Sequence, residues 1–342
     1  MSDKDRMKST QEITQEVREL GQWIPALRQQ VAHVVVGQKY LVDRLLLGLL
    51  ANGHLLLEGV PGLAKTLTVK TMAACIQTGF QRLQFTPDLL PADLVGTLIY
   101  NPRTGEFTTK LGPIFSNLIL ADEINRAPAK VQSALLEVMQ EYQVTIAGET
   151  HRVPEPFLVM ATQNPIETEG TYPLPEAQVD RFIMKVVVGY PSAREEAVVV
   201  ERSLGAGADV TRILSADGLA ELQALTKGVY VDRTIVDYAV ALTAATRDPD
   251  QVGLPKVKPF IAFGASPRGS INLVHAARAL AVIRGRRYVL PSDVTELARD
   301  VLRHRIVPSF SALAEEVSAD MILDRIIPAV PAPQLTAAEL SA

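Results

Sequence analysis

A glycine-rich turn between an apolar run and a helix-forming segment constrains this chain more than any other feature. The turn, Gly59-Val60-Pro61-Gly62-Leu63-Ala64-Lys65-Thr66, follows the apolar run Leu55-Leu56-Leu57. Such a turn aims several backbone N–H groups at one point, and the N-terminus of the next helix adds partial positive charge there. Lysine then reaches the β- and γ-phosphates of a nucleotide, and the threonine hydroxyl binds Mg²⁺. The pattern therefore predicts a phosphate-binding loop.

One residue of the turn departs from the usual pattern G-x-x-x-x-G-K-[ST], because Ala64 stands where that pattern has its second glycine. A methyl group is tolerated there only if the local φ stays in a range that alanine accepts. The alternative is a chance glycine-rich turn, since the chain has 21 glycines. The preceding strand, the pair Lys65-Thr66 and a second motif downstream favour the phosphate-binding loop.

The second motif is a pair of acids, Asp122 and Glu123, directly after the apolar run 117–121. The run predicts a buried parallel strand with carboxylates at its C-terminal end. Ligands of open α/β sheets bind at that edge. We expect Asp122 to hold Mg²⁺, usually through water, and Glu123 to polarise the water that attacks the γ-phosphate. Acids after a strand often only open a turn, but this is a weak alternative downstream of a phosphate loop.

Composition narrows the class of protein. The 342 residues suffice for two domains, and the net charge of −4 gives no electrostatic reason to expect nucleic-acid binding. Cys75 is the only cysteine, so no disulfide framework is possible, and we expect it to be a small core residue. No apolar run approaches the ~18 residues of a membrane span, and the charged segment Met1 to Arg6 lacks a signal core. We therefore expect a cytoplasmic protein without a membrane segment.

Alternating strand and helix patterns predict a parallel sheet covered by helices on both faces. Two segments, 86–115 and 142–156, interrupt the alternation, and each predicts an inserted hairpin. After a glycine- and alanine-rich stretch at 204–208 the pattern becomes helical from Asp217, with an irregular tail from Pro328. We predict an α/β nucleotide-binding core at 1–206, including an N-terminal helix, and a helical lid at 207–342. The strands expected in the core are 54–58, 80–85, 117–121, 157–162 and 184–189.

Four motifs, taken in order, resemble the MoxR family of AAA+ ATPases over roughly residues 25–310. They are Gly59 to Thr66, Ala121-Asp122-Glu123-Ile124-Asn125-Arg126-Ala127-Pro128, Ala161-Thr162-Gln163-Asn164-Pro165 and Glu169 to Phe182. The resemblance implies an AAA+ P-loop core with a parallel five-stranded sheet, and a small C-terminal all-helical lid. Ala64 is usual in that family. The insert at 86–115 resembles the helix-2 insertion of MoxR proteins, magnesium-chelatase ATPase subunits and MCM helicases.

The resemblance also implies roles for single residues. Asn164 corresponds to the sensor-1 residue, whose amide orients the attacking water, although asparagine before proline is also a common turn. Arg181 corresponds to an arginine finger that acts on the ATP of a neighbouring subunit. The alternative for Arg181 is a surface arginine paired with Asp180 or Glu176.

Two further residues or segments are implied in the same way. Arg268 corresponds to sensor 2, a lid residue that senses the γ-phosphate; the alternative is an ordinary first-turn arginine, which the helix dipole disfavours. Val36-Gly37-Gln38 resembles the loop that packs on adenine, although a tight turn between two helices would look the same. The residues expected to contact ATP or Mg²⁺ are then Gly37, Gln38, Gly59, Val60, Pro61, Gly62, Leu63, Ala64, Lys65, Thr66, Leu67 and Asp122, with Thr66 and Asp122 on the metal.

The resemblance implies an ATPase that assembles as a hexameric ring, since a finger acting in trans requires head-to-tail contacts that close into a ring. It implies chaperone-like maturation, or metal insertion, with a partner that carries a von Willebrand factor A domain. Alternatives are a chelatase ATPase subunit, an MCM-like nucleic-acid motor, or an adapter that binds nucleotide only. Residues 86–115 mix Arg103 and Lys110 with acids, which disfavours the motor. The complete set of site residues disfavours the adapter.

Overall fold

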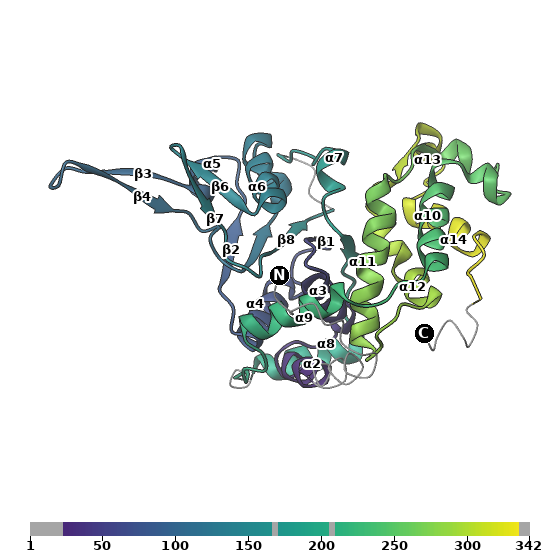
Figure 1. The fold of residues 1–342 in the computed structure, drawn as a ribbon, viewed down its shortest axis with the longest axis horizontal. Helices are drawn as coiled ribbons and strands as arrows, with labels where there is room; N and C mark the ends of the chain where they lie inside the picture. Colours follow the sequence, from purple (N-terminus) through teal and green to yellow (C-terminus); the bar gives the residue numbers. More distant parts are fainter. Residues whose placement is uncertain (1–22, 166–169, 205–208, 335–342) are drawn as a thin grey trace, which may run out of the picture. The chain divides into compact units, whose positions relative to one another are not determined.

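The computed structural model describes residues 23–165, 170–204 and 209–334 (Figure 1). The chain forms two compact units, one of residues Gln29–Ala220 and one of Glu221–Ala342 together with Met1–Arg28. The predicted boundary at 206–207 lies outside the described residues, as does Glu169. The division between these two units falls within helix α9, which spans Ala216–Lys227.

The first unit is built on a five-stranded sheet in the order β2-β5-β8-β1-β9, in which every neighbouring pair is parallel. The predicted five-stranded parallel sheet is therefore confirmed, and no strand end differs from the prediction by more than two residues. The strands are β1 (Leu55–Glu58), β2 (Phe80–Gln84), β5 (Leu118–Asp122), β8 (Leu158–Gln163) and β9 (Met184–Val187).

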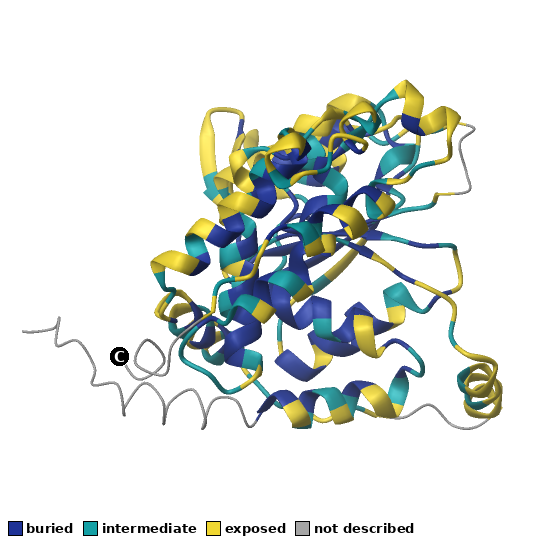
Figure 2. Ribbon diagram, turned by 90° about the vertical axis from the view of Figure 1, so that its right-hand side faces the viewer, coloured by how far each residue is buried: buried dark blue, intermediate teal, exposed yellow. Residues whose placement is uncertain are grey.

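Both faces of the sheet are covered, so the inner strands β1, β5 and β8 are nearly continuous apolar runs, whereas the edge strand β2 carries polar residues. Along β5, Ile119 and Ala121 pack against α6 (Ala129–Glu141), in one buried cluster with Val131 and Leu135. The alternate residues of the strand face the side that α3 (Lys39–Ala51) and α4 (Lys65–Ile76) cover. Figure 2 shows the buried residues concentrated in the sheet and on the helix faces that meet it.

His54 joins the sheet to α6 just before β1. Its Nδ1 accepts a hydrogen bond from the Val159 N–H at 3.0 Å, so its Nε2–H donates to the Met139 carbonyl at 2.9 Å. The rings of Tyr142 and Phe157 flank the imidazole at 6.1 and 5.8 Å between centroids. Complete burial lowers the pKa of His54 to about 4, so the ring is neutral at pH 7.

Two hairpins stand at the positions that the sequence predicted. The first consists of α5 (Pro91–Val95), β3 (Gly96–Asn101) and β4 (Glu106–Leu111), and β3–β4 extends away from the sheet in Figure 1. The second pairs β6 (Gln143–Ile146) with β7 (Glu149–Arg152). At the base of the first hairpin, the N–H groups of Gly112 and Ile114 donate to the carbonyls of Val95 and Leu94, each at 3.2 Å. The hairpin is therefore fixed at its base.

Short elements complete the first unit. Helix α2 (Trp23–Val34), which belongs to this unit from Gln29 onward, precedes the turn that leads into α3, and the 3₁₀ turn Ile124–Arg126 follows β5. Helices α7 (Glu176–Val179) and α8 (Ala193–Ser203) flank β9 along the chain. Cys75, on α4, is buried as the sequence predicted, and burial raises the pKa of its thiol.

The second unit is helical, as predicted for the lid. Its helices include α10 (Arg233–Arg247), α11 (Pro267–Ile283), α12 (Pro291–Leu302), α13 (Phe310–Ala314) and α14 (Ala319–Ala329). One small departure is the antiparallel pair β10 (Ile261–Phe263) and β11 (Val307–Pro308). A second is that α14 continues through Pro328, so the irregular tail begins later than predicted. None of the described helices combines the length and the apolarity that crossing a membrane requires.

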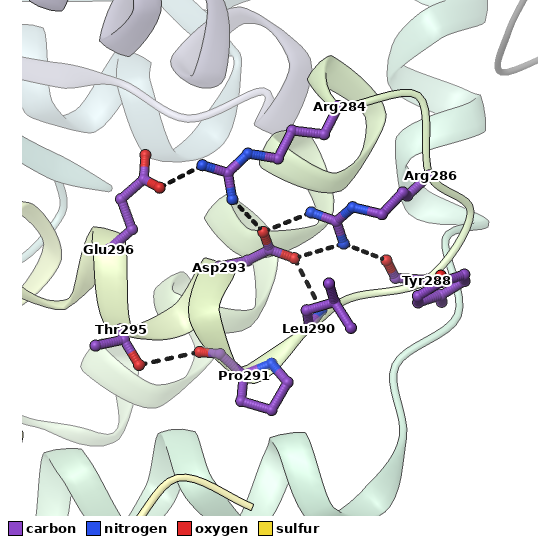
Figure 3. Close-up of polar contacts among 8 residues, drawn as sticks. All are labelled: Arg284, Arg286, Tyr288, Leu290, Pro291, Asp293, Thr295 and Glu296. Atoms are coloured by element: carbon purple, nitrogen blue, oxygen red, sulfur yellow. Dashed lines mark hydrogen bonds and ion pairs between the residues drawn. The ribbon is translucent and has the colours of Figure 1, made fainter. Parts of the chain in front are cut away.

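A buried carboxylate organises the lid around the start of α12 (Figure 3). Asp293 is fully buried and accepts hydrogen bonds from Arg284 at 2.8 Å and from Arg286 at 2.6 and 2.9 Å. It also accepts the Leu290 N–H at 2.8 Å, which caps α12. Arg284 further pairs with Glu296. Two guanidiniums and a backbone donor thus compensate the buried charge and tie the end of α11 to α12.

Candidate active site

The loop from β1 to α4 wraps around the amine of Lys65. Its Nζ donates to the Gly59 carbonyl at 2.5 Å and to the Val60 carbonyl at 3.3 Å. Partial burial lowers the pKa of Lys65, and the nearby carboxylates of Asp122 and Glu123 oppose that shift. The lysine amine lies inside a concave loop, next to the N-terminus of α4, where an anionic group would be stabilised.

Backbone geometry explains two residues of the loop. Ala64, the N-cap of α4, has φ +54°, in the left-handed region, which costs a residue with a Cβ roughly 1–2 kcal/mol. The alanine therefore occupies a conformation that suits the glycine of the usual pattern. At Gly59, a Cβ would lie 2.8 Å from the Val188 carbonyl oxygen, so only glycine lets the loop pass this close to the end of β9.

The two acids lie at the C-terminal end of β5, and Thr162 on the neighbouring strand β8 fixes both. The Thr162 hydroxyl donates to Asp122 Oδ1 at 2.6 Å and accepts from the Glu123 N–H at 2.8 Å. Glu123 itself has φ +55°, which turns the chain sharply after the strand. One hydroxyl thus orients the Asp122 carboxylate and the backbone of Glu123 together.

Strand β2 contributes two polar side chains on the other flank of the acids. Arg82 donates to Asp122 Oδ2 through Nε at 3.0 Å and through Nη2 at 2.6 Å. Gln84 accepts from Arg82 Nη2 at 2.8 Å and donates to Glu123 Oε2 at 3.0 Å. Both acids are therefore connected to β2 by a chain of hydrogen bonds that ends on Arg126, whose Nε lies 3.3 Å from Glu123 Oε2.

Sequence reasoning gave no role to Arg82, Gln84 or Thr162. Thr162 lies within a quoted motif, whereas Arg82 and Gln84 were visible only as polar residues in an otherwise strand-like segment. The alternation Arg82-Leu83-Gln84 places the two polar side chains on one face of β2, which was the available signal. That alternation indicates contacts with Asp122 and Glu123 only once the strand order is known. In that order β2 pairs with β5, and β8 lies on the other side of β5.

One cavity of about 390 Å³ collects most of the predicted residues, a volume in the range of small-molecule sites. It brings together the phosphate loop, both acids and Asn164. Among the predicted contact residues, Val60, Gly37 and Gln38 are not among those that line it. The lining residues are Gly59, Pro61, Gly62, Leu63, Ala64, Lys65, Thr66, Leu67, Arg82, Asp122, Glu123, Thr162 and Asn164.

The turn expected to contact adenine packs against the start of α8. Gly37 has φ +72°, and a Cβ on it would lie 2.9 Å from Cβ of Pro191. Gln38, the residue before α3, is buried. The tight packing explains the glycine as a structural residue, and it neither requires nor opposes a contact with a base.

Arg181 lies outside the cavity lining, on the face of α6. Its Nη1 donates to the Leu136 carbonyl at 3.1 Å, while its Nε is buried and has no hydrogen-bond partner among the described residues. Gln132 of the same helix contacts two other segments. Its amide donates to the carbonyl of Tyr172 at 2.9 Å, in the segment before Arg181, and to the carbonyl of Ala127 at 3.1 Å, after Glu123. Helix α6 thus touches both the turn after Glu123 and the segment that carries Arg181.

Arg268 belongs to the second unit. It is exposed in the first turn of α11, where its N–H donates to the Ser266 hydroxyl at 3.2 Å. The serine is the N-cap, so the start of this helix is fixed in the lid by its own sequence.

The donor set at the cavity fits magnesium. Thr66 and Asp122 both line it and offer a hydroxyl and a carboxylate, the hard oxygen ligands that Mg²⁺ takes in nucleotide sites, where phosphates and water complete the shell. No cluster of three or more His, Cys, Asp or Glu side chains suited to a metal occurs among the described residues.

Comparison with known proteins identifies the family. Residues 54–184 match the ATPase family associated with various cellular activities (AAA), and residues 256–326 match the AAA lid domain. The chain is 54% identical over 308 residues to Chaperone MoxR1 of Mycobacterium tuberculosis, covering 90% of this chain and 82% of that protein. The chain belongs to the MoxR family of AAA+ ATPases.

Two further relatives agree with this assignment. Protein MoxR of Paracoccus denitrificans is 32% identical, with 88% of this chain and 93% of that protein covered. A crystal structure of a Cytophaga hutchinsonii protein superposes with a TM-score of 0.88 at 48% identity, covering 94% of this chain and 98% of the other. As a MoxR-family protein, the chain is a chaperone-like ATPase that binds nucleotide and hydrolyses ATP.

Proposed function

We propose that this MoxR-family protein binds Mg–ATP in the cavity between the phosphate loop and the ends of β5 and β8, and that Glu123 activates the attacking water. The observation that carries the proposal is the shared cavity: Lys65, Thr66, Asp122, Glu123 and Asn164 all line it. These residues come from the ends of strands β5 and β8 and from the start of helix α4. Their convergence supplies a phosphate-binding cation, oxygen ligands and a candidate base within one small volume.

Each of these side chains has a distinct task. The loop amides and Lys65 bind the β- and γ-phosphates, so the ammonium leaves the Gly59 carbonyl when nucleotide enters. Glu123 acts as the general base that polarises the attacking water, and Asn164, at the end of β8, orients that water. Thr66 and Asp122 would hold Mg²⁺, which when bound neutralises charge on the phosphates. The Thr162 hydroxyl keeps Asp122 and the Glu123 backbone in register with one another.

The protein works as a ring of six subunits that contact one another head to tail. Arg181 of each subunit acts on the ATP of the next subunit. Arg181 supports this proposal because it lies outside its own cavity lining and keeps a buried Nε without a partner among the described residues. A guanidinium with unused donors suits a phosphate supplied by another chain. Arg268 would report the γ-phosphate to the lid.

The client is a protein, since the relative Chaperone MoxR1 is named as a chaperone. We further propose that the ATPase matures a partner that carries a von Willebrand factor A domain, as the motif resemblance implies. Insertion of a metal into that partner is one form of such maturation, and an ATPase subunit of a chelatase is the related alternative. Nucleic acid is not expected as a ligand, since the net charge is −4.

Calorimetric titration of the Lys65→Ala variant with ATP tests the cavity assignment. The substitution removes the loop's side-chain cation, so ATP affinity should fall sharply. Lys70→Ala is the matched control, because Lys70 is an exposed lysine of the same helix α4 that does not line the cavity. Native affinity in Lys65→Ala would show that nucleotide binds elsewhere.

A further inference from the structure

We propose that Arg82 competes with Mg²⁺ for Asp122, so that the metal is admitted with nucleotide only when the guanidinium gives up the carboxylate. This inference deepens the proposed Mg–ATP site and rests on it. It assigns a metal-gating role to a residue of β2 that the sequence motifs did not include.

The contacts of Asp122 show that its carboxylate is fully engaged. Oδ1 accepts the Thr162 hydroxyl at 2.6 Å, and Oδ2 accepts both Nε and Nη2 of Arg82 at 3.0 and 2.6 Å. The Asp122 side chain is only 14% exposed, so water cannot easily substitute for these donors. A ligand that needs Oδ2, directly or through water, must displace the guanidinium.

Electrostatic repulsion prevents the Arg82 guanidinium and Mg²⁺ from occupying the Asp122 carboxylate at the same time. A divalent ion within a few ångströms of a guanidinium is strongly repelled, whereas each is attracted to the same carboxylate. While Arg82 neutralises Asp122, the carboxylate offers Mg²⁺ little net attraction. The phosphates of an incoming nucleotide restore negative charge to the cavity, and the balance then shifts toward the metal.

Arg82 is built to leave. Its side chain is 49% exposed on β2, an edge strand of the sheet, so the guanidinium becomes fully hydrated when it turns away from Asp122. Its Nη2 also donates to Gln84 Oε1 at 2.8 Å, which gives the guanidinium a partner on its own strand. Gln84 in turn donates a hydrogen bond to Glu123, so departure of Arg82 changes the hydrogen bonding of both Asp122 and Glu123.

The test compares how much Mg²⁺ each variant needs to tighten nucleotide binding. ADP affinity is measured by calorimetry in EDTA and across a Mg²⁺ series, for the full-length wild type, Arg82→Gln and Arg82→Lys. Because ADP is used, hydrolysis does not enter. Manganese replaces magnesium in a parallel series, in which the electron paramagnetic resonance signal of free Mn²⁺ reports metal occupancy directly. Arg233→Gln is the control, since it removes an exposed arginine from an ion pair with Asp237 in the lid.

We expect Arg82→Gln to lower the Mg²⁺ and Mn²⁺ concentrations for half-saturation by about threefold or more, as loss of a competing ion pair predicts. ADP affinity in EDTA should stay within about twofold of wild type. Arg82→Lys, which keeps the charge but loses the forked contact, should fall between the two. In an Asp122→Asn background, Arg82→Gln should no longer change the metal requirement.

Two results would overturn the inference. An unchanged or raised metal requirement in Arg82→Gln would show that the guanidinium does not compete for Asp122. A large loss of ADP affinity in EDTA would instead make Arg82 a phosphate ligand. If wild-type ADP binding does not respond to Mg²⁺ or Mn²⁺ at all, the proposed metal site fails as well; a metal response in the wild type that Arg82→Gln leaves untouched refutes only the competition.

Discussion

The amide of Gln84 on β2 donates to Glu123 Oε2 at 3.0 Å, so the candidate base is oriented by a side chain from the neighbouring strand. Glu123 otherwise has the looser contact with Arg126 at 3.3 Å. We expect Gln84→Leu to lower kcat about tenfold with unchanged ATP affinity, because small misplacements of a catalytic group are costly. Steady-state hydrolysis and calorimetry measure the two quantities. Gln81→Leu, on the same strand but the other face, should leave both unaltered; equal losses in the two variants would point to damage of β2.

Arg181 should matter for hydrolysis and not for binding. We expect Arg181→Ala to bind ATP normally but hydrolyse it slowly, because a finger acts mainly in the transition state. Co-assembly with Glu123→Gln should recover activity, since some sites then combine an intact Arg181 with an intact Glu123. The control mixture pairs Arg181→Ala with the double variant Arg181→Ala/Glu123→Gln, which cannot form such sites. Normal hydrolysis by Arg181→Ala alone would reject the finger role.

Ala64 carries backbone strain that glycine would relieve. Its φ of +54° is unfavourable for alanine by about 1–2 kcal/mol, whereas glycine adds only some entropy to the unfolded chain. We expect Ala64→Gly to raise the free energy of unfolding by about 0.5–1 kcal/mol in urea titrations. The matched control is Ala74→Gly, an exposed position within α4, which should lose about 1 kcal/mol. A loss of similar size at both positions would mean that the left-handed geometry is wrong.

Protonation of His54 should weaken the first unit in acid. Its folded-state pKa of about 4 lies below the ordinary value of 6.5, so its contribution is complete above pH 6.5 and is lost as the pH falls from 6.5 to about 4. The loss amounts to roughly 3 kcal/mol at the lower end. Urea unfolding across this range should show a flatter pH profile for His54→Gln than for wild type. Titration of the imidazole resonance in the wild type checks the pKa itself, and a midpoint near 6.5 would contradict the burial argument.

The local motifs could be predicted from the sequence because their signals are local. Gly59 to Thr66 and the acids after β5 are read from a few consecutive residues, and alternating patterns sufficed for the parallel sheet and the helical lid. The contacts around the acids could not be predicted in this way. They depend on the register in which Gln84 lies opposite Asp122, and on β8 lying on the far side of β5, and no local pattern encodes either. Nor does spacing alone place Arg181 on α6, 45 residues from its carbonyl partner Leu136.

The length of the β3–β4 hairpin would convert a small rotation at its base into a larger displacement of its tip. Its six paired positions form a stiff ladder, and a six-residue strand is about 20 Å long. Its base is held by α5, which packs on α6, the helix that begins just after Glu123. A turn of about 10° at that base would swing the tip through about 3–4 Å over this length. The exposed Tyr100–Phe107 ring pair, toward the far end, would travel farther than any movement at the site that caused it.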